Sequence, residues 1–145
     1  MRCCARLPSR CYHNGMDVIL VPVSPGELLD KITILRIKSA RIADAGKLAN
    51  VRRELALLEQ HWRQAVPEPG PLAADEAALE QVNSELWDIE DRIRELEGQR
   101  RFDAAFIELA RAVYLRNDER AAIKQRINRA LDSAIIEEKS YQPYR

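Results

Sequence analysis

Cysteine is absent from most of this chain, because all three cysteines lie within the first eleven residues. The remainder therefore cannot form disulfide bonds or supply a thiolate nucleophile. Histidine is almost as scarce: His61 is the only one after residue 15, which leaves no histidine pair for a metal ion. We expect a protein of the reducing cytoplasm, with no metal and no other cofactor.

Glycine, aromatic residues and long apolar runs are also scarce. Five glycines among 145 residues, with abundant Ala, Leu, Glu and Arg, favour helices over sheets. No apolar run approaches the roughly 20 residues that cross a bilayer, so we expect no membrane partner. The 23 basic residues are balanced by 23 acidic ones, and without a basic excess nucleic-acid binding loses its usual electrostatic support.

Residues 1–15 differ from the rest of the chain. They contain three arginines, no acidic residue and no periodic apolar pattern. We interpret them as a disordered or mis-annotated extension, followed by a single helical domain at residues 16–145. Structural zinc favours cysteine pairs two to four residues apart, which this segment lacks. The alternative is that Cys3, Cys4, Cys11 and His13 form a zinc site, which their spacing disfavours.

The first helix has a clear beginning. Ser24 is a good N-cap, Pro25 suits the first helical position, and Glu27 can return a hydrogen bond to the cap. The β-branched run before it, residues 18–23, contains a proline and predicts at most a short edge strand.

Four helical patterns follow one another along the chain. The first stops at Gly46, a plausible left-handed C-cap, and prolines and a glycine at residues 67–71 end the second. The third has apolar residues at alternating spacings of three and four, typical of coiled-coil-like packing, and Asp103 caps the fourth. We predict an all-α, four- to five-helix bundle with long antiparallel helices at residues 25–45, 47–66, 72–99 and 103–134, and an extended tail at 137–145.

Apolar residues occur on both sides of the first helix. Ile34 and Ile37 lie among charges, opposite the main apolar face, and a helix of this kind is usually central or at an interface. Trp87 similarly lies off the apolar seam of the third helix. These three residues either pack within the chain or form a surface for self-association.

Polar residues interrupt the apolar stripe of the last helical pattern. If residues 103–134 form one helix, then Asn117, Arg120 and Lys124 face the core, where unpaired charges are costly. The interpretation that we favour breaks the helix near Asn117, which becomes a new N-cap. The other keeps one helix and places these three side chains, with Arg36, around a bound anion.

The opening SPGELLDKITIL, with KLANVRRELALLE, LWDIED and EEKSY further on, resembles an uncharacterised family of small helical bacterial and phage proteins. The resemblance covers residues 16–144. The family has no assigned activity, so the resemblance implies a helical fold and no functional residues.

A much weaker similarity links Phe102-Asp103-Ala104-Ala105-Phe106-Ile107 to the all-helical chorismate mutases. It implies a dicarboxylate held by arginine and lysine, with Gln125 near the ether oxygen. The interruption at Gly46 and the proline-rich residues 67–71 depart from that family.

We favour a non-catalytic accessory or interaction protein that forms a homodimer or binds another protein; the alternative is a binding protein or small enzyme for an anionic metabolite.

Overall fold

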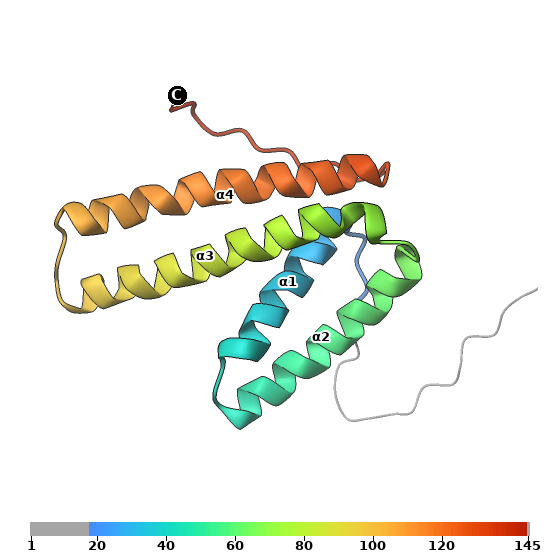
Figure 1. The fold of residues 1–145 in the computed structure, drawn as a ribbon, viewed down its shortest axis with the longest axis horizontal. Helices are drawn as coiled ribbons and strands as arrows, with labels where there is room; N and C mark the ends of the chain where they lie inside the picture. The colour runs from blue at the N-terminus through green and yellow to red at the C-terminus, as the bar shows by residue number, and fades with distance from the viewer. Residues whose placement is uncertain (1–17, 145) are drawn as a thin grey trace, which may run out of the picture.

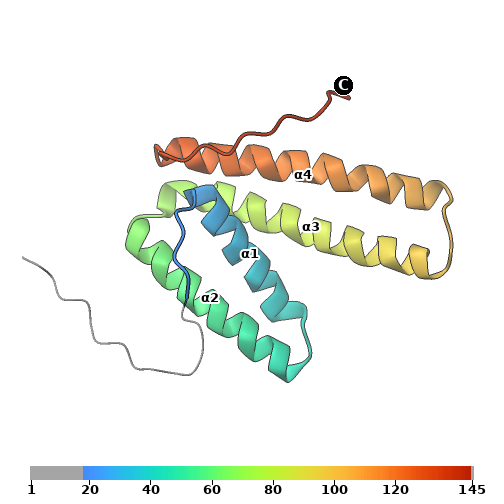
Figure 2. The same ribbon diagram turned by 180° about the vertical axis from the view of Figure 1, so that it is seen from behind.

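The computed structural model describes residues 18–144, and within them the chain forms four α-helices and one 3₁₀ turn. α3 and α4 lie side by side as a long antiparallel hairpin, and α1 and α2 form a shorter one that diverges from it (Figure 1; Figure 2). The predicted all-α fold is confirmed. The elements are α1 (Pro25–Arg41), α2 (Ala45–Ala65), η1 (Gly70–Leu72), α3 (Ala73–Gly98) and α4 (Ala104–Ala130).

α1 is the central helix, because it packs against α2, α3 and α4. Its predicted start is confirmed: the Ser24 hydroxyl accepts a hydrogen bond from the Glu27 amide at 3.2 Å, and Pro25 is the first helical residue. Its predicted end is wrong, since α1 stops at Arg41 and Gly46 lies inside α2. Asp44 decides this boundary by accepting a hydrogen bond from the Lys47 amide at 2.8 Å, which caps a new helix before the glycine.

The apolar core lies where the two hairpins meet. Residues from every helix contribute, so the hydrophobic effect ties the first hairpin to the second. Leu29 and Ile32 of α1 are fully buried there, and Leu55 and Leu58 of α2 pack against the core from its edge. The buried members are Leu29, Ile32, Trp62, Val66, Leu72, Leu79, Val82, Ile123 and Ile127.

α4 is one continuous helix of 27 residues, so the predicted break near Asn117 is wrong. Asp103 caps it as expected, with its carboxylate accepting from the Phe106 amide at 3.4 Å. Asn117 does not cap a new helix: its side-chain amide donates back to the carbonyl of Val113 at 2.9 Å. The two charged residues that suggested a break, Arg120 and Lys124, are instead paired with carboxylates from other elements, which offsets the cost of placing them inside.

The two ends of the described chain contain neither helix nor strand. Residues 18–23 form no edge strand, and most of their apolar side chains are exposed. Residues 131–144, which we call the C-terminal strap, turn back at the end of α4 and run along it, in line with the expected extended tail (Figure 1). The predicted extension, residues 1–15, lies outside the described residues. Among residues 18–144, no helix combines the length and apolarity needed to cross a membrane.

Candidate functional site

α1 crosses α4 in direct contact at Gly26. The Gly26 amide donates to the side-chain oxygen of Asn128 at 2.7 Å, inside the protein. A Cβ atom at position 26 would lie 2.6 Å from the carbonyl oxygen of Lys124 and 2.9 Å from that Asn128 oxygen. The glycine of the opening motif is therefore required by the close approach of two helices, not by an unusual backbone angle.

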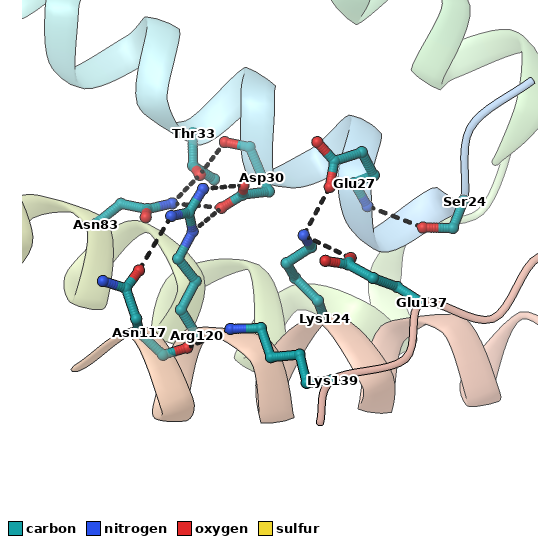
Figure 3. Close-up of polar contacts among 10 residues, drawn as sticks. All are labelled: Ser24, Glu27, Asp30, Thr33, Asn83, Asn117, Arg120, Lys124, Glu137 and Lys139. Atoms are coloured by element: carbon teal, nitrogen blue, oxygen red, sulfur yellow. Dashed lines mark hydrogen bonds and ion pairs between the residues drawn. The ribbon is translucent and has the colours of Figure 1, made fainter. Parts of the chain in front are cut away.

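One turn along α1, Asp30 forms a bidentate ion pair with Arg120 of α4. The Arg120 Nε donates to one carboxylate oxygen at 2.8 Å and Nη2 to the other at 2.5 Å (Figure 3). The Asp30 side chain is only 2% exposed, whereas that of Arg120 is 28% exposed. Planar guanidinium groups match carboxylates in this geometry, so the pair fixes the angle between the helices as well as their distance.

Three further polar groups complete the surroundings of Asp30. The Asn83 side chain on α3 donates to an Asp30 oxygen at 2.9 Å and to the Thr33 hydroxyl oxygen at 3.0 Å. Asn117 accepts a hydrogen bond from Arg120 Nη1 at 3.3 Å. α1, α3 and α4 are thus joined by a single hydrogen-bonded network.

Lys124 forms a second set of ion pairs beside this network. Its ammonium nitrogen lies 2.6 Å from a Glu27 carboxylate oxygen and 2.7 Å from one of Glu137 in the C-terminal strap (Figure 3). The network around Asp30 and the ion pairs of Lys124 together form what we call the α1–α4 polar cluster. Its members are Glu27, Asp30, Thr33, Asn83, Asn117, Arg120, Lys124 and Glu137.

Both cations of the cluster have a raised pKa. Hydrogen bonding to Asp30 raises the pKa of Arg120 and outweighs the effect of its burial. Burial lowers the pKa of Lys124, but hydrogen bonds to Glu137 and Glu27 more than offset this and leave the pKa above its ordinary value of 10.5. Both side chains remain charged at neutral pH.

The raised pKa of Lys124 predicts a loss of stability at alkaline pH. The folded protein binds the lysine proton more tightly than the unfolded chain, so this contribution is complete below pH 10.5 and disappears as the pH rises through the folded-state value. We expect the difference in unfolding free energy between wild type and Lys124→Met, measured by urea denaturation, to narrow from about pH 10 to about pH 12. A difference that stays constant over this range would contradict the assignment.

The cluster is internally satisfied. Among the described residues, no buried side-chain nitrogen or oxygen atom lacks a hydrogen-bond partner. No group of His, Cys, Asp or Glu side chains in residues 18–144 could hold a metal ion. The arrangement therefore serves first to lock α1 onto α3 and α4, with each of its two cations bonded to at least one carboxylate.

Residues 19–144 match a family of unknown function. The chain belongs to this family, DUF6165. No curated protein and no solved structure matches it. The matched region of this DUF6165 chain contains the opening motif, the whole α1–α4 polar cluster and the C-terminal strap.

The DUF6165 fold separates one predicted anion-site residue from the others. Arg36 does not approach Arg120 or Lys124; its guanidinium donates to Glu59 of α2 at 3.2 Å and to Glu76 of α3 at 2.5 Å. Burial lowers the pKa of Arg36, but these hydrogen bonds raise it by more, so that its pKa lies above the ordinary value of an arginine. Asn117, Arg120 and Lys124 do come together, already bonded to groups of the same chain.

The residues predicted for self-association fall into two groups. Ile37 is only 7% exposed and is buried within the single DUF6165 chain. Ile34 and Trp87 are partly exposed and line a groove of about 480 Å³, which Asn117 and Arg120 also line. The guanidinium of Arg41 lies 5.9 Å from the centre of the Trp87 ring and covers part of it. Only Ile34 and Trp87 thus remain accessible.

Sequence reasoning missed the acidic half of the cluster in this DUF6165 chain. Glu27 was assigned only to the cap of the first helix, and Asp30 was given no role. Their spacing carried a usable signal: they lie one turn apart, and so do Arg120 and Lys124 on α4. Two such ladders of opposite charge predict paired helices.

Proposed function

We propose that this chain is a non-catalytic interaction module that self-associates through the distal hairpin, residues 87–113. The observation that carries the proposal is that, beyond Trp87 and Asp88, which Arg41 at the end of α1 contacts, this part of the α3–α4 hairpin projects past the ends of α1 and α2 (Figure 1; Figure 2). Two helices alone can bury only the stripe between them, and a stable layer needs a further element against it. A second copy of the same hairpin supplies that element as a four-helix bundle.

Large apolar side chains support this surface. Phe102 and Ile107 are 53% and 56% exposed, and Phe102 stacks edge-on against Phe106 at the tip. Contiguous exposed apolar residues on a protein surface mark sites of association. Trp87, Ile89, Ile93, Phe106, Leu109 and Val113 are partly exposed along the same hairpin.

Charge favours a second copy as the partner. Within the distal hairpin, the α3 part contains five acidic and two basic residues, while residues 99–113 contain three basic and two acidic residues. An isologous dimer in which α3 of one copy lies beside residues 99–113 of the other is therefore favoured over one that places α3 beside α3, where the excess negative charges would repel. The absence of cysteine after Cys11 supports a place in the reducing cytoplasm.

The proposal predicts a dimer that two surface charges disrupt. We expect the full chain to sediment as a dimer, and Phe102→Glu/Ile107→Glu to raise the dissociation constant about a hundredfold or more, because each tenfold step requires only about 1.4 kcal/mol. Sedimentation equilibrium over a concentration series measures this directly. Both residues are exposed in a single chain, so folding of the monomer should be unaffected.

The matched control is Ile19→Glu/Ile136→Glu, which places the same charges on side chains that are 72% and 69% exposed outside the distal hairpin. This variant should remain dimeric. A wild-type chain that is monomeric at every concentration, or a control that dissociates as readily as the test variant, would reject the proposed surface.

This geometry leaves fewer residues that could bind an anion than the sequence suggested. Arg36 and Arg120 are each held by carboxylates of the same chain, so neither is open to a ligand without breaking an ion pair. Such a role would fall to Lys124, one of whose two carboxylate partners comes from outside the helices.

A further inference from the structure

Glu137 is the only member of the α1–α4 polar cluster that does not belong to a helix. It approaches Lys124 from the C-terminal strap, and the same ammonium nitrogen also contacts Glu27 of α1 (Figure 3). An ammonium group has three N–H donors. One carboxylate partner of Lys124 is therefore fixed by α1, and the other is delivered by a segment with no secondary structure.

The Lys124 end of this contact is rigid. Its side chain is 9% exposed, and its neighbour Asn128 is buried while bonded to the Gly26 amide. The N-terminus of α1 lies close by and adds a positive partial charge. An oxyanion placed at the position of the Glu137 carboxylate would meet an ammonium group that is already held in place.

The strap end of the contact is loosely packed. Open hollows of about 850 and 630 Å³ lie between the strap and α4. Beyond the turn at its start, the contacts of the strap with α4 include the Tyr144 hydroxyl on Asp118, an edge-on contact between Tyr144 and Tyr114, and a 3.5 Å hydrogen bond from Lys139 to the Asn117 carbonyl. Segments with few buried apolar contacts open at low free-energy cost.

A defined turn aims the strap at this position. Asp132 adopts a left-handed backbone angle, φ 49°, and the Ser133 amide donates to the Asn128 carbonyl at 2.9 Å. This closes the end of α4 and reverses the chain, so that Glu137 reaches back to Lys124. The tether keeps the local concentration of that carboxylate high.

We propose that Lys124 forms an oxyanion-binding site, which the chain's own Glu137 fills and which an external carboxylate or phosphate occupies when the strap releases. The strap is then a tethered competitor of the ligand. Its release removes Glu137 and leaves Glu27 as the remaining carboxylate on the ammonium group. The inference does not depend on self-association, because the distal hairpin lies elsewhere in the molecule.

The test removes the charge of the tethered competitor. Glu137→Gln keeps the size of the side chain but bonds the ammonium group less strongly. We expect succinate or inorganic phosphate to bind this variant at least about tenfold more tightly than wild type, since competition by the strap reduces apparent affinity. Titration calorimetry and the melting temperature, each against chloride at equal ionic strength, give the affinities, and comparing succinate with phosphate shows which oxyanion fits.

Two variants control the experiment. Glu138→Gln removes a neighbouring exposed charge and should behave as wild type, while Glu137→Gln/Lys124→Gln should lose the response altogether. In wild type, the anion should speed amide hydrogen exchange in residues 134–144, because ligand and strap compete. Equal anion binding by Glu137→Gln, Glu138→Gln and wild type would overturn the proposal, and so would a response that survives loss of Lys124.

Discussion

Gly26→Ala is expected to destabilise the protein by about 3 kcal/mol, a large effect for one methyl group. The new Cβ atom would lie 2.6 Å from a backbone oxygen, which cannot rotate away as the end of a flexible side chain could. The clash is relieved only if α1 moves away from α4, and that movement also lengthens the hydrogen bond from the Gly26 amide to Asn128. Urea denaturation followed by circular dichroism measures the loss.

Gly98→Ala is the matched control for this prediction. Gly98 ends α3, and a Cβ atom there would meet nothing within 4 Å. The same methyl group should stabilise the chain by roughly 0.5 kcal/mol, because alanine restricts the unfolded state. If Gly26→Ala were as well tolerated as Gly98→Ala, the close crossing of α1 and α4 would not exist in solution.

Arg120→Met should be similarly severe, at about 3–5 kcal/mol, since it leaves a buried charge without its partner. The Asp30 carboxylate is almost inaccessible to water, and among the described residues only the Asn83 side chain would still donate to it. Asp30→Asn should cost less, about 1–3 kcal/mol, because Arg120 is partly exposed and can regain water. The expected asymmetry follows from the unequal exposure of the two groups.

A double-mutant cycle separates the ion pair from general damage. Asp30→Asn/Arg120→Met should cost clearly less than the sum of the single changes, as the carboxylate that Arg120→Met strands is then absent. Arg126→Met, on the same helix, removes an exposed ion pair with Asp75 and should cost at most about 1 kcal/mol. Additive single costs, or an Arg126 effect as large as that of Arg120, would show that Asp30 and Arg120 are not coupled.

Much of the secondary structure was predictable because its signals are local. Ser24 and Asp103 cap helices by accepting hydrogen bonds from amides three residues ahead, so neighbouring residues suffice to identify them. The prolines at residues 67–71 end a helix wherever it packs. The alternating apolar spacings of the third pattern likewise predicted a packed helix face, and Leu79, Val82 and Leu86 of α3 are buried.

The errors occurred where two local signals competed or where partners came from a distance. Gly46 was interpreted as a helix end, yet Asp44, two residues earlier, starts the next helix. Asn117 was interpreted as an N-cap because burying unpaired polar side chains on the core-facing side of a helix costs free energy. The carboxylate that removes this cost, Asp30, is 90 residues away from Arg120, and no helical wheel shows it.

The sequence by itself determined that the chain is helical, where most helices begin, and which stripes are apolar, because these depend on residues within one or two turns of each other. Only the tertiary structure decided how the charges are used. It placed Arg36 against α2 and α3, paired Arg120 and Lys124 with Asp30 and Glu27, and brought Glu137 back onto Lys124. The physical reason is that the cost of a charge depends on its burial and its partner, and both arise only when helices cross.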